Sequence, residues 1–262
     1  EKMKEYRLDI ANRLAESNPN SVGTGDDSVT RQYYPTGYGP TSQDVLIPAF
    51  LAAYAQQSPE NVYLGYFPKI PLPNWKITYD GLIKIKFMAK VFKSAILSHS
   101  YRSVYTVNSY QSNLYYAIDT GNGSPAALYP ASNSFFPKYD LNQVTIQEQF
   151  APLVGIDLTW NNSLLTRFEF RKSRTLTFSM INKQLTDLNT DEYIVGLGYR
   201  IKDVAFTVSS LGGGGRKTHI SSDLDIKVDF SIRNNRTVLR RIDQDIDQVS
   251  SGMRVISINT SI

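Results

Sequence analysis

The residue types that most often perform catalysis or bind metals are scarce in this sequence. It holds two histidines and no cysteine among 262 residues, which excludes thiol catalysis, disulfides and cysteine-ligated metal sites. His99 lies in a predicted strand and His219 follows a glycine-rich stretch. Neither has a second histidine at a spacing that would share a metal ion. Both are therefore interpreted as ordinary polar residues.

Two further motifs resemble binding sites but lack essential parts. The run Gly212–Gly215 precedes Arg216 and Lys217, whereas a phosphate-binding loop ends in Lys-Ser/Thr and opens a helix. The alternating aspartates 243, 245 and 247 lack the glycine and later glutamate of a calcium loop. No Gly-x-Ser-x-Gly motif of a hydrolase is present. The sequence thus predicts no catalytic, cofactor-binding or metal-binding residue, and a protein that is not an enzyme.

Charge and composition narrow the class of protein. The 28 Lys and Arg and 24 Asp and Glu are interspersed, so no basic segment indicates nucleic-acid binding. No stretch approaches the roughly 18 consecutive apolar residues of a membrane helix. A transmembrane β-barrel stays open, because its strands alternate and keep the mean hydropathy low; the value here is −0.29, with 17 Tyr and 12 Phe.

Strict two-residue alternation is the strongest structural signal. It indicates strands with one apolar and one polar or charged face, most clearly over 153–161 and 223–233. The apolar positions are Val154, Ile156, Leu158, Trp160, Leu224, Ile226, Val228 and Phe230. The charged positions opposite them are Asp157, Asp223, Asp225, Lys227 and Asp229.

The same alternation extends to other segments. Over 192–203 the apolar positions alternate, and their parity flips near Asp203, which predicts a β-bulge. In Leu165–Leu185 the alternation is interrupted by Lys172 and Arg174. They mark either an interfacial or periplasmic stretch of one long strand, or a turn between two short ones. Further strands are predicted at 90–113, 143–150, 236–248 and 253–262, with short turns at 161–163, 189–191, 234–235 and 250–252 and looser connections at 121–137 and 212–215.

The first 75 residues have a different pattern. Helical spacing predicts a short amphipathic helix over 1–18, and residues 21–40 have the composition of a loop. A second, largely buried helix is predicted from an N-cap at Thr41 to about Gln57. Closely spaced prolines make 67–75 extended and irregular. We therefore divide the chain into a helical and proline-rich segment, 1–75, and consecutive antiparallel strands, 76–262.

Strand length separates the two β architectures that fit this pattern. The predicted strands are at or above the about 9 to 11 residues that a membrane-spanning strand needs, whereas soluble strands average about 5 or 6. Aromatic residues near the strand ends are typical of interfacial girdles. A soluble β-sandwich that turns its charged faces outward remains an alternative.

Several blocks of the chain resemble one family of outer-membrane proteins. They are DVLIPAFLAAY at 44–54, IPLPNWKITYDGL at 70–82, LSHSYRS at 97–103, EQFAPLVGID at 148–157, RFEF at 167–170, RTL at 174–176 and GLGYRIKD at 196–203. They are similar to the C-terminal part of the SprA/Sov family, the outer-membrane translocons of the Bacteroidota type IX secretion system. The resemblance covers nearly the whole chain.

The resemblance implies a mainly β protein that forms a segment of a very large antiparallel transmembrane β-barrel, with short helices near its N-terminus. Such barrels export folded cargo that carries a C-terminal sorting domain, in gliding motility and virulence-factor export. The expected partners are membrane lipid, the rest of the same barrel polypeptide, a PorV-like shuttle barrel, a periplasmic plug protein and cargo. No nucleic acid or cofactor is expected, and both chain ends are expected to be cut from a longer polypeptide.

On this interpretation the eight alternating apolar residues of 153–161 and 223–233 face lipid, and the five charged residues face the pore. Residues 1–75 lie at the pore or on the periplasmic side of the outer membrane. An extracellular β-sandwich that binds glycans, or a small outer-membrane uptake barrel, is the alternative function.

Overall fold

Long antiparallel strands dominate this computed structural model, which describes residues 2–26, 33–55, 57–67, 73–130, 132–209, 217–242 and 246–262. The helices are α1 (Lys2–Glu16), α2 (Gln43–Ala55), the 3-10 helix η1 (Gly81–Lys84) and α3 (Lys86–Val91). The strands are β1 (Thr24–Asp26), β2 (Tyr33–Pro35), β3 (Trp75–Tyr79), β4 (Phe92–Ser112), β5 (Tyr139–Trp160), β6 (Leu164–Ser179), β7 (Gln184–Ser209), β8 (Lys217–Arg241) and β9 (Ile246–Ser261).

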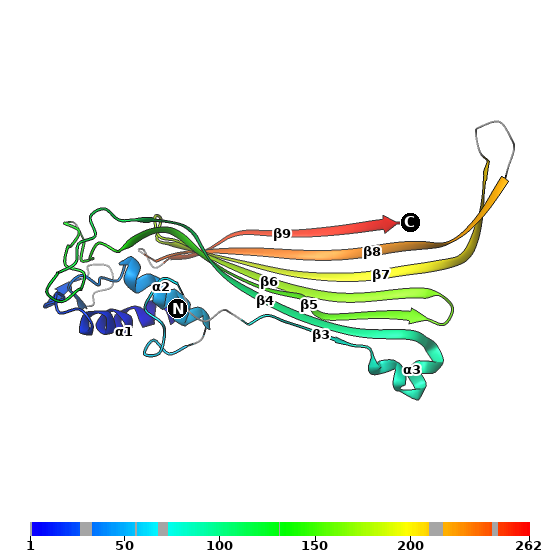
Figure 1. Cartoon of the computed structure of the whole chain (residues 1–262), viewed down its shortest axis with the longest axis horizontal. Helices are drawn as coiled ribbons and strands as arrows, with labels where there is room; N and C mark the ends of the chain where they lie inside the picture. The colour runs from blue at the N-terminus through cyan, green and yellow to red at the C-terminus, as the bar shows by residue number, and fades with distance from the viewer. Residues whose placement is uncertain are drawn as a thin grey trace.

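Seven of these strands form one antiparallel sheet in chain order, from β3 to β9. The predicted mainly β class is confirmed. In the described part of the chain the sheet is open, with β3 and β9 at its two edges. The strands converge near α1 and α2 and fan out toward α3 at the far end (Figure 1).

Several strands are longer than the sequence predicts, but not all. The strand predicted over 90–113 begins only at Phe92, after α3, and the one predicted over 236–248 is divided between β8, which ends at Arg241, and β9, which begins at Ile246. The separate strands predicted over 143–150 and 153–161 are parts of β5. The turns predicted at 189–191, 234–235 and 250–252 are wrong, because these residues lie inside β7, β8 and β9. These residues are paired in the strand ladder instead, as Thr190 is with Asn235. Local turn preference is outweighed here by the pairing of long neighbouring strands.

Other predictions of strand geometry hold. The turn at 161–163 is confirmed by the hydrogen bond from Ser163 N to Trp160 O, 3.1 Å, and Ser163 has a φ of 69°. The bulge near Asp203 is confirmed by a register shift between Ile201 and Val204 and by a φ of 56° at Asp203. Of the two possibilities for Leu165–Leu185, the structure shows one strand, β6, through Lys172 and Arg174. The chain turns only after Ser179.

Both predicted N-terminal helices are present, and with β1, β2 and the 113–138 connection they form what we call the helical lobe. The second helix begins at Gln43, and its first turn includes a hydrogen bond from Leu46 N to Ser42 O, 2.9 Å. The N-cap prediction at Thr41 is therefore one residue early. None of the described helices is long and apolar enough to cross a membrane.

The main hydrophobic core lies where α2 packs on the sheet. The rings of Phe50 and Phe178 are 5.8 Å apart. The fully or almost fully buried side chains here include Val45, Leu46, Ile47, Ala49, Phe50, Val144, Ile146, Leu176 and Phe178. The all-round apolar character of α2 is thus explained by burial on most of its sides.

Gln43 fastens the start of α2 to the sheet. Its amide nitrogen donates to Tyr139 O at 2.7 Å, and its amide oxygen accepts from Leu141 N at 2.9 Å. The Gln43 amide thus makes the same two hydrogen bonds to the first residues of β5 that the backbone of a neighbouring strand would make. These residues of β5 precede its pairing with β6, which starts at Gln143.

Some predictions concern residues outside the described ranges. They are 68–72 of the proline-rich segment, the glycine run 212–215, and Asp243 and Asp245. Asp247 lies in β9, paired with Arg240, while His99 lies in β4 and His219 in β8.

Candidate functional site

One side of the sheet is apolar over a broad band across strands β5 to β9. We call this band the apolar face; its residues are Val154, Ile156, Leu158, Trp160, Leu164, Phe168, Phe170, Tyr193, Val195, Leu197, Tyr199, Ile201, Leu224, Ile226, Val228, Phe230, Ile232, Ile256 and Ile258. The strand register aligns them in rows, such as Ile156, Phe168, Val195, Phe230 and Ile258. All eight apolar positions predicted from the alternation of 153–161 and 223–233 lie on this face.

The apolar face is largely uncovered. Leu197 is 56% exposed, and Phe168, Val195, Val228 and Ile258 are also exposed. Apolar side chains this numerous are normally covered by another surface, because exposed apolar patches on soluble monomers rarely exceed a few hundred Å².

Aromatic rings lie at both ends of the apolar face. Toward the helical lobe, Phe170 stacks on Tyr193 with ring centroids 4.6 Å apart. On the neighbouring strands Trp75, Tyr101 and Phe150 form a continuous row of rings. At the far end Phe92 contacts Trp160, with centroids 4.5 Å apart, and the Trp160 indole donates to Thr166. Amphipathic rings at two levels are typical of surfaces with an apolar middle and wet ends.

A polar row closes the apolar face on the side of the helical lobe. Lys172, Asp191, Asn234 and Arg254 follow one another across β6 to β9 in register. Arg254 donates to the Asn234 side chain at 2.7 Å. Alternation through β6 puts this row on the same side as Phe168 and Phe178. The interruption of the pattern at Lys172 therefore belongs to a row that crosses the sheet.

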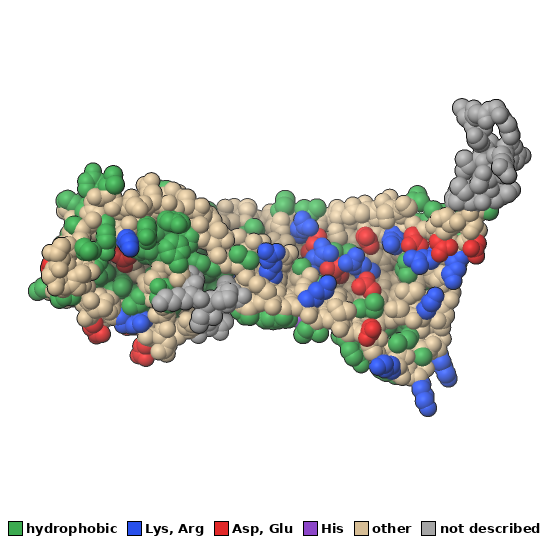
Figure 2. Space-filling model, in the orientation of Figure 1, with side chains coloured by type: hydrophobic (Ala, Val, Ile, Leu, Met, Phe, Trp, Pro, Cys, Tyr) green, Lys and Arg blue, Asp and Glu red, His purple; other side chains and the backbone are tan. Residues whose placement is uncertain are grey.

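The opposite side of the same strands is charged. We call it the charged face; its residues are Asp157, Arg167, Glu169, Arg171, Glu192, Arg200, Asp223, Asp225, Lys227, Asp229 and Arg233. Acidic and basic side chains gather along the middle of the sheet (Figure 2). All five charged positions predicted from the sequence lie on this face.

Ion pairs run across the charged face from strand to strand. The side chain of Glu169 is only 5% exposed and contacts Arg167 and Arg171, both at 2.6 Å. Arg171 reaches Glu192 at 3.5 Å, and Glu192 in turn pairs with Arg233 at 2.7 Å. Burial of a carboxylate needs such partners, because an unpaired buried charge is costly.

The charged residues predicted from the sequence differ in how closely they contact a partner on this face. Asp157 lies 3.7 Å from Arg167. Asp225 pairs with Arg200 at 2.7 Å and lies 3.9 Å from Lys227. Asp223 accepts a hydrogen bond from the Asp203 backbone at the bulge.

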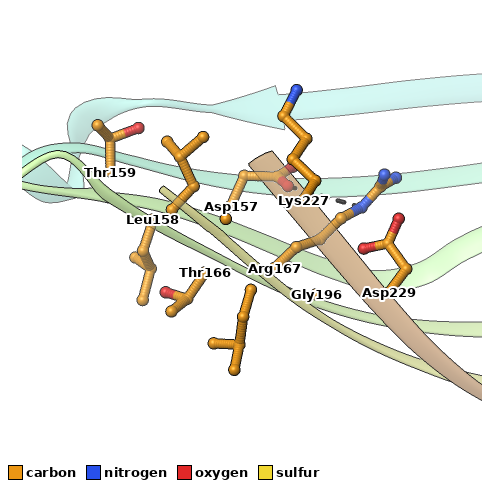
Figure 3. A pocket seen from close by; sticks show the side chains of 11 residues that line it. Asp157, Leu158, Thr159, Thr166, Arg167, Gly196, Lys227 and Asp229 are labelled. Carbon is orange, nitrogen blue, oxygen red and sulfur yellow. Dashed lines mark ion pairs between the residues drawn. The ribbon is translucent and has the colours of Figure 1, made fainter. Parts of the chain in front are cut away.

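A shallow recess of about 210 Å³ opens on the charged face between β5 and β8 (Figure 3). Gly196 forms part of its floor, and a Cβ there would lie 2.3 Å from an oxygen of Asp229. Glycine therefore allows Asp229 to approach the backbone of β7. Asp157, Arg167, Lys227 and Asp229 surround the recess with both signs of charge.

Neither the pairing of Glu169 with its two arginines nor the Glu192–Arg233 pair was predicted from the sequence. The available signal was the Arg-x-Glu-x-Arg spacing of 167–171, which puts opposite charges side by side on one strand face. Glu192 and Arg233 gave no such signal, because their pairing depends on the register of β7 with β8.

Two further carboxylates have shifted pKa values, Asp44 in α2 of the helical lobe and Asp187 in β7. Burial raises the pKa of Asp44 to about 6, although Tyr66 donates a hydrogen bond to its carboxylate. Burial would also raise the pKa of Asp187, but hydrogen bonds from Arg174 and the charge of Arg240 lower it below the ordinary value. The contact of Asp44 joins α2 to Tyr66, whereas the contacts of Asp187 join β7 to β6 and β8.

Within the described residues, no three His, Asp or Glu side chains are grouped to hold a metal ion. His99 instead contacts Leu153 O through Nδ1 at 2.7 Å. No protein-family model matches the sequence, and neither does any curated protein.

Proposed function

We propose that this chain forms part of the wall of an outer-membrane channel that exports folded proteins, the translocon of type IX secretion. The observation that carries the proposal is the exposed apolar face on the same strands that carry the charged face. A membrane strand needs these two environments, lipid outside and water inside. The similarity of blocks 44–54, 148–157 and 196–203 to the SprA/Sov family supports the choice of channel.

The dimensions of the apolar face support contact with lipid. It extends from Tyr193 to Ile201 on β7 and from Leu224 to Ile232 on β8. These lengths match the about 9 residues that a tilted strand needs to cross the hydrocarbon layer. The aromatic rings at both ends correspond to the girdles of membrane barrels.

The open edges support membership of a larger barrel. Strand β9 carries the exposed Ile256 and Ile258 and pairs with β8 on one side. In lipid each unpaired backbone group costs several kcal/mol, so a membrane sheet cannot keep free edges. We therefore expect β3 and β9 to pair with further strands of the same, longer polypeptide.

The sheet side that the helical lobe covers indicates where the lobe lies relative to the proposed wall. It packs on Leu176 and Phe178, which share a sheet side with Phe168 beyond the polar row. In the proposed channel it therefore lies on the outer side of the wall, rather than in the pore; the resemblance to the SprA/Sov family is what implies that this end is periplasmic. We propose that the lobe contacts a PorV-like shuttle barrel or the periplasmic plug, and that cargo passes along the charged face. The chain conducts without catalysis, and the energy for export comes from elsewhere in the cell envelope.

The test is Val228→Arg in the full-length protein, with Lys227→Arg as the matched control on the other face. An arginine facing lipid near mid-membrane costs about 2 to 4 kcal/mol, so we expect loss of folded protein from the outer-membrane fraction and loss of cargo export. The control, one residue away, should leave both unchanged.

Normal assembly of the Val228→Arg variant would refute the assignment of this face to lipid. A product of this chain that is soluble and monodisperse without detergent would instead support an extracellular β-sandwich that binds glycans.

A further inference from the structure

From Gly81 onward, the segment between β3 and β4 carries charge of only one sign. From Gly81 to Lys93 it contains four lysines, at 84, 86, 90 and 93, and no acidic residue. All four lysines are exposed. We call residues 81–93, which include η1, α3 and the start of β4, the lysine segment.

Large apolar side chains alternate with these lysines. Ile85 is 54% exposed and Phe87 is 71% exposed. A short stretch that presents cations and bare apolar groups together has the composition of an interfacial anchor, in which apolar groups enter the acyl boundary and cations stay among the headgroups.

The lysine segment is fixed to the sheet at the end of the apolar face. Asn161 donates from its side chain to Lys90 O at 2.8 Å and from its backbone to Val91 O at 3.2 Å. Phe92 contacts the ring of Trp160 on the apolar face. Figure 1 places α3 at the end of the sheet opposite the helical lobe, where basic side chains project outward in Figure 2.

We infer that the lysine segment binds the phosphate groups of anionic membrane lipids, with Ile85 and Phe87 inserted between their acyl chains. This inference rests on the proposed function, because it requires the apolar face to be in lipid. Lipid is the ligand that fits this segment. The segment continues the apolar face at the end where Phe92 contacts Trp160, and all of its charges are positive. A protein surface would have to supply both an acidic and an apolar partner at that same level.

The test compares two double variants of the full-length protein, purified in detergent and mixed with phosphatidylglycerol or phosphatidylcholine. Lys84→Gln with Lys86→Gln removes two charges from the lysine segment. The control, Lys2→Gln with Lys138→Gln, removes two exposed charges from the helical lobe. Native mass spectrometry counts the lipids retained. A lysine near an anionic membrane surface contributes about 1 kcal/mol, so each lost lysine should lower the apparent affinity for phosphatidylglycerol about fivefold.

We expect this loss only in the Lys84/Lys86 variant, with retention of phosphatidylcholine unchanged. In the wild type, high salt should also reduce phosphatidylglycerol retention, because salt screens exposed charges. Equal phosphatidylglycerol retention by the two variants overturns the inference but leaves the proposed function intact. A wild-type protein that stays soluble without detergent and retains no lipid overturns both.

Discussion

The same side of β6 has two environments. Phe178, at the end under α2, is 0% exposed, whereas Phe168, nearer the other end, is 42% exposed. Both rings belong to one uninterrupted strand and point to one side of the sheet. The difference lies in what covers them: the helical lobe covers the first, and nothing in the described chain covers the second.

The polar row of Lys172, Asp191, Asn234 and Arg254 lies between these two environments. The protein therefore supplies its own apolar cover on one side of the row and leaves the other side to its surroundings. If those surroundings are lipid, the row lies at the membrane surface, where charged side chains can reach water. The two regions should then respond differently to substitution, pH and solvent.

The largest expected difference concerns the two phenylalanines. Phe178→Ala should destabilise the reconstituted protein by about 3 to 5 kcal/mol, because it loses apolar burial and leaves a cavity. Phe168→Ala should cost about 1.5 to 3 kcal/mol, since lipid chains fill the space and only the transfer from water is lost. Urea unfolding of both variants in the same vesicles measures the contrast. Equal costs would show that Phe168 is packed against protein.

A pH titration should separate the lobe from the apolar face. The folded-state pKa of Asp44 is raised to about 6, so its folded form holds a proton that the unfolded form has released. The free energy of unfolding of the lobe should therefore be highest below about pH 4 and fall by up to about 3 kcal/mol as the pH rises past 6. Asp44→Asn should abolish this fall and stabilise the lobe at pH 7.

Hydrogen exchange of the α2 amides at pH 4 and pH 7 tests this directly. The exposed Asp9→Asn in α1 serves as the control, for which the wild-type pH dependence should persist. A wild-type lobe equally protected at both pH values would contradict the prediction.

Glu169→Gln probes the charged face. It leaves Arg167 and Arg171 without their shared buried carboxylate, and we expect a loss of about 1 to 3 kcal/mol in urea unfolding. Asp225→Asn, in the exposed pair with Arg200, should cause no measurable change. The reverse order of the two effects would mean that burial of Glu169 is not what makes its ion pairs stabilising.

The smallest expected effect belongs to the contact between α2 and β5. Gln43→Ala removes two hydrogen bonds to the backbone and should lower stability by about 1 to 2 kcal/mol. Faster hydrogen exchange should appear at Leu141 N and in α2, with the apolar face unaffected. Gln43→Glu keeps the acceptor for Leu141 but not the donor to Tyr139, so protection of the Leu141 amide should survive in that variant.

Part of this structure could be predicted because it depends on local sequence. Two-residue alternation determines which side chains of β5 and β8 share a face, and a flip in parity located the bulge at Asp203. The short turn at 161–163 and the two N-terminal helices also follow from local preferences, whereas η1 and α3 were not predicted.

The rest depends on contacts between distant residues. Asn189–Asp191 favour a turn in isolation, but in the sheet they pair with 234–236 and continue the strand. Gln43 meets β5 only because α2 packs there, and Glu192 meets Arg233 only through the register of β7 and β8. The sequence therefore predicted the two faces of the site but not the network of ion pairs that stabilises one of them.

If the charged face lines a channel, as we propose, that network has a consequence for transport. Because cations and anions alternate across the charged face, their electric fields largely cancel within a few ångströms of the wall. A conduit lined in this way would neither concentrate nor repel a passing protein according to its isoelectric point. Acidic and basic passengers could then use one route, and discrimination among them would have to occur before they enter it.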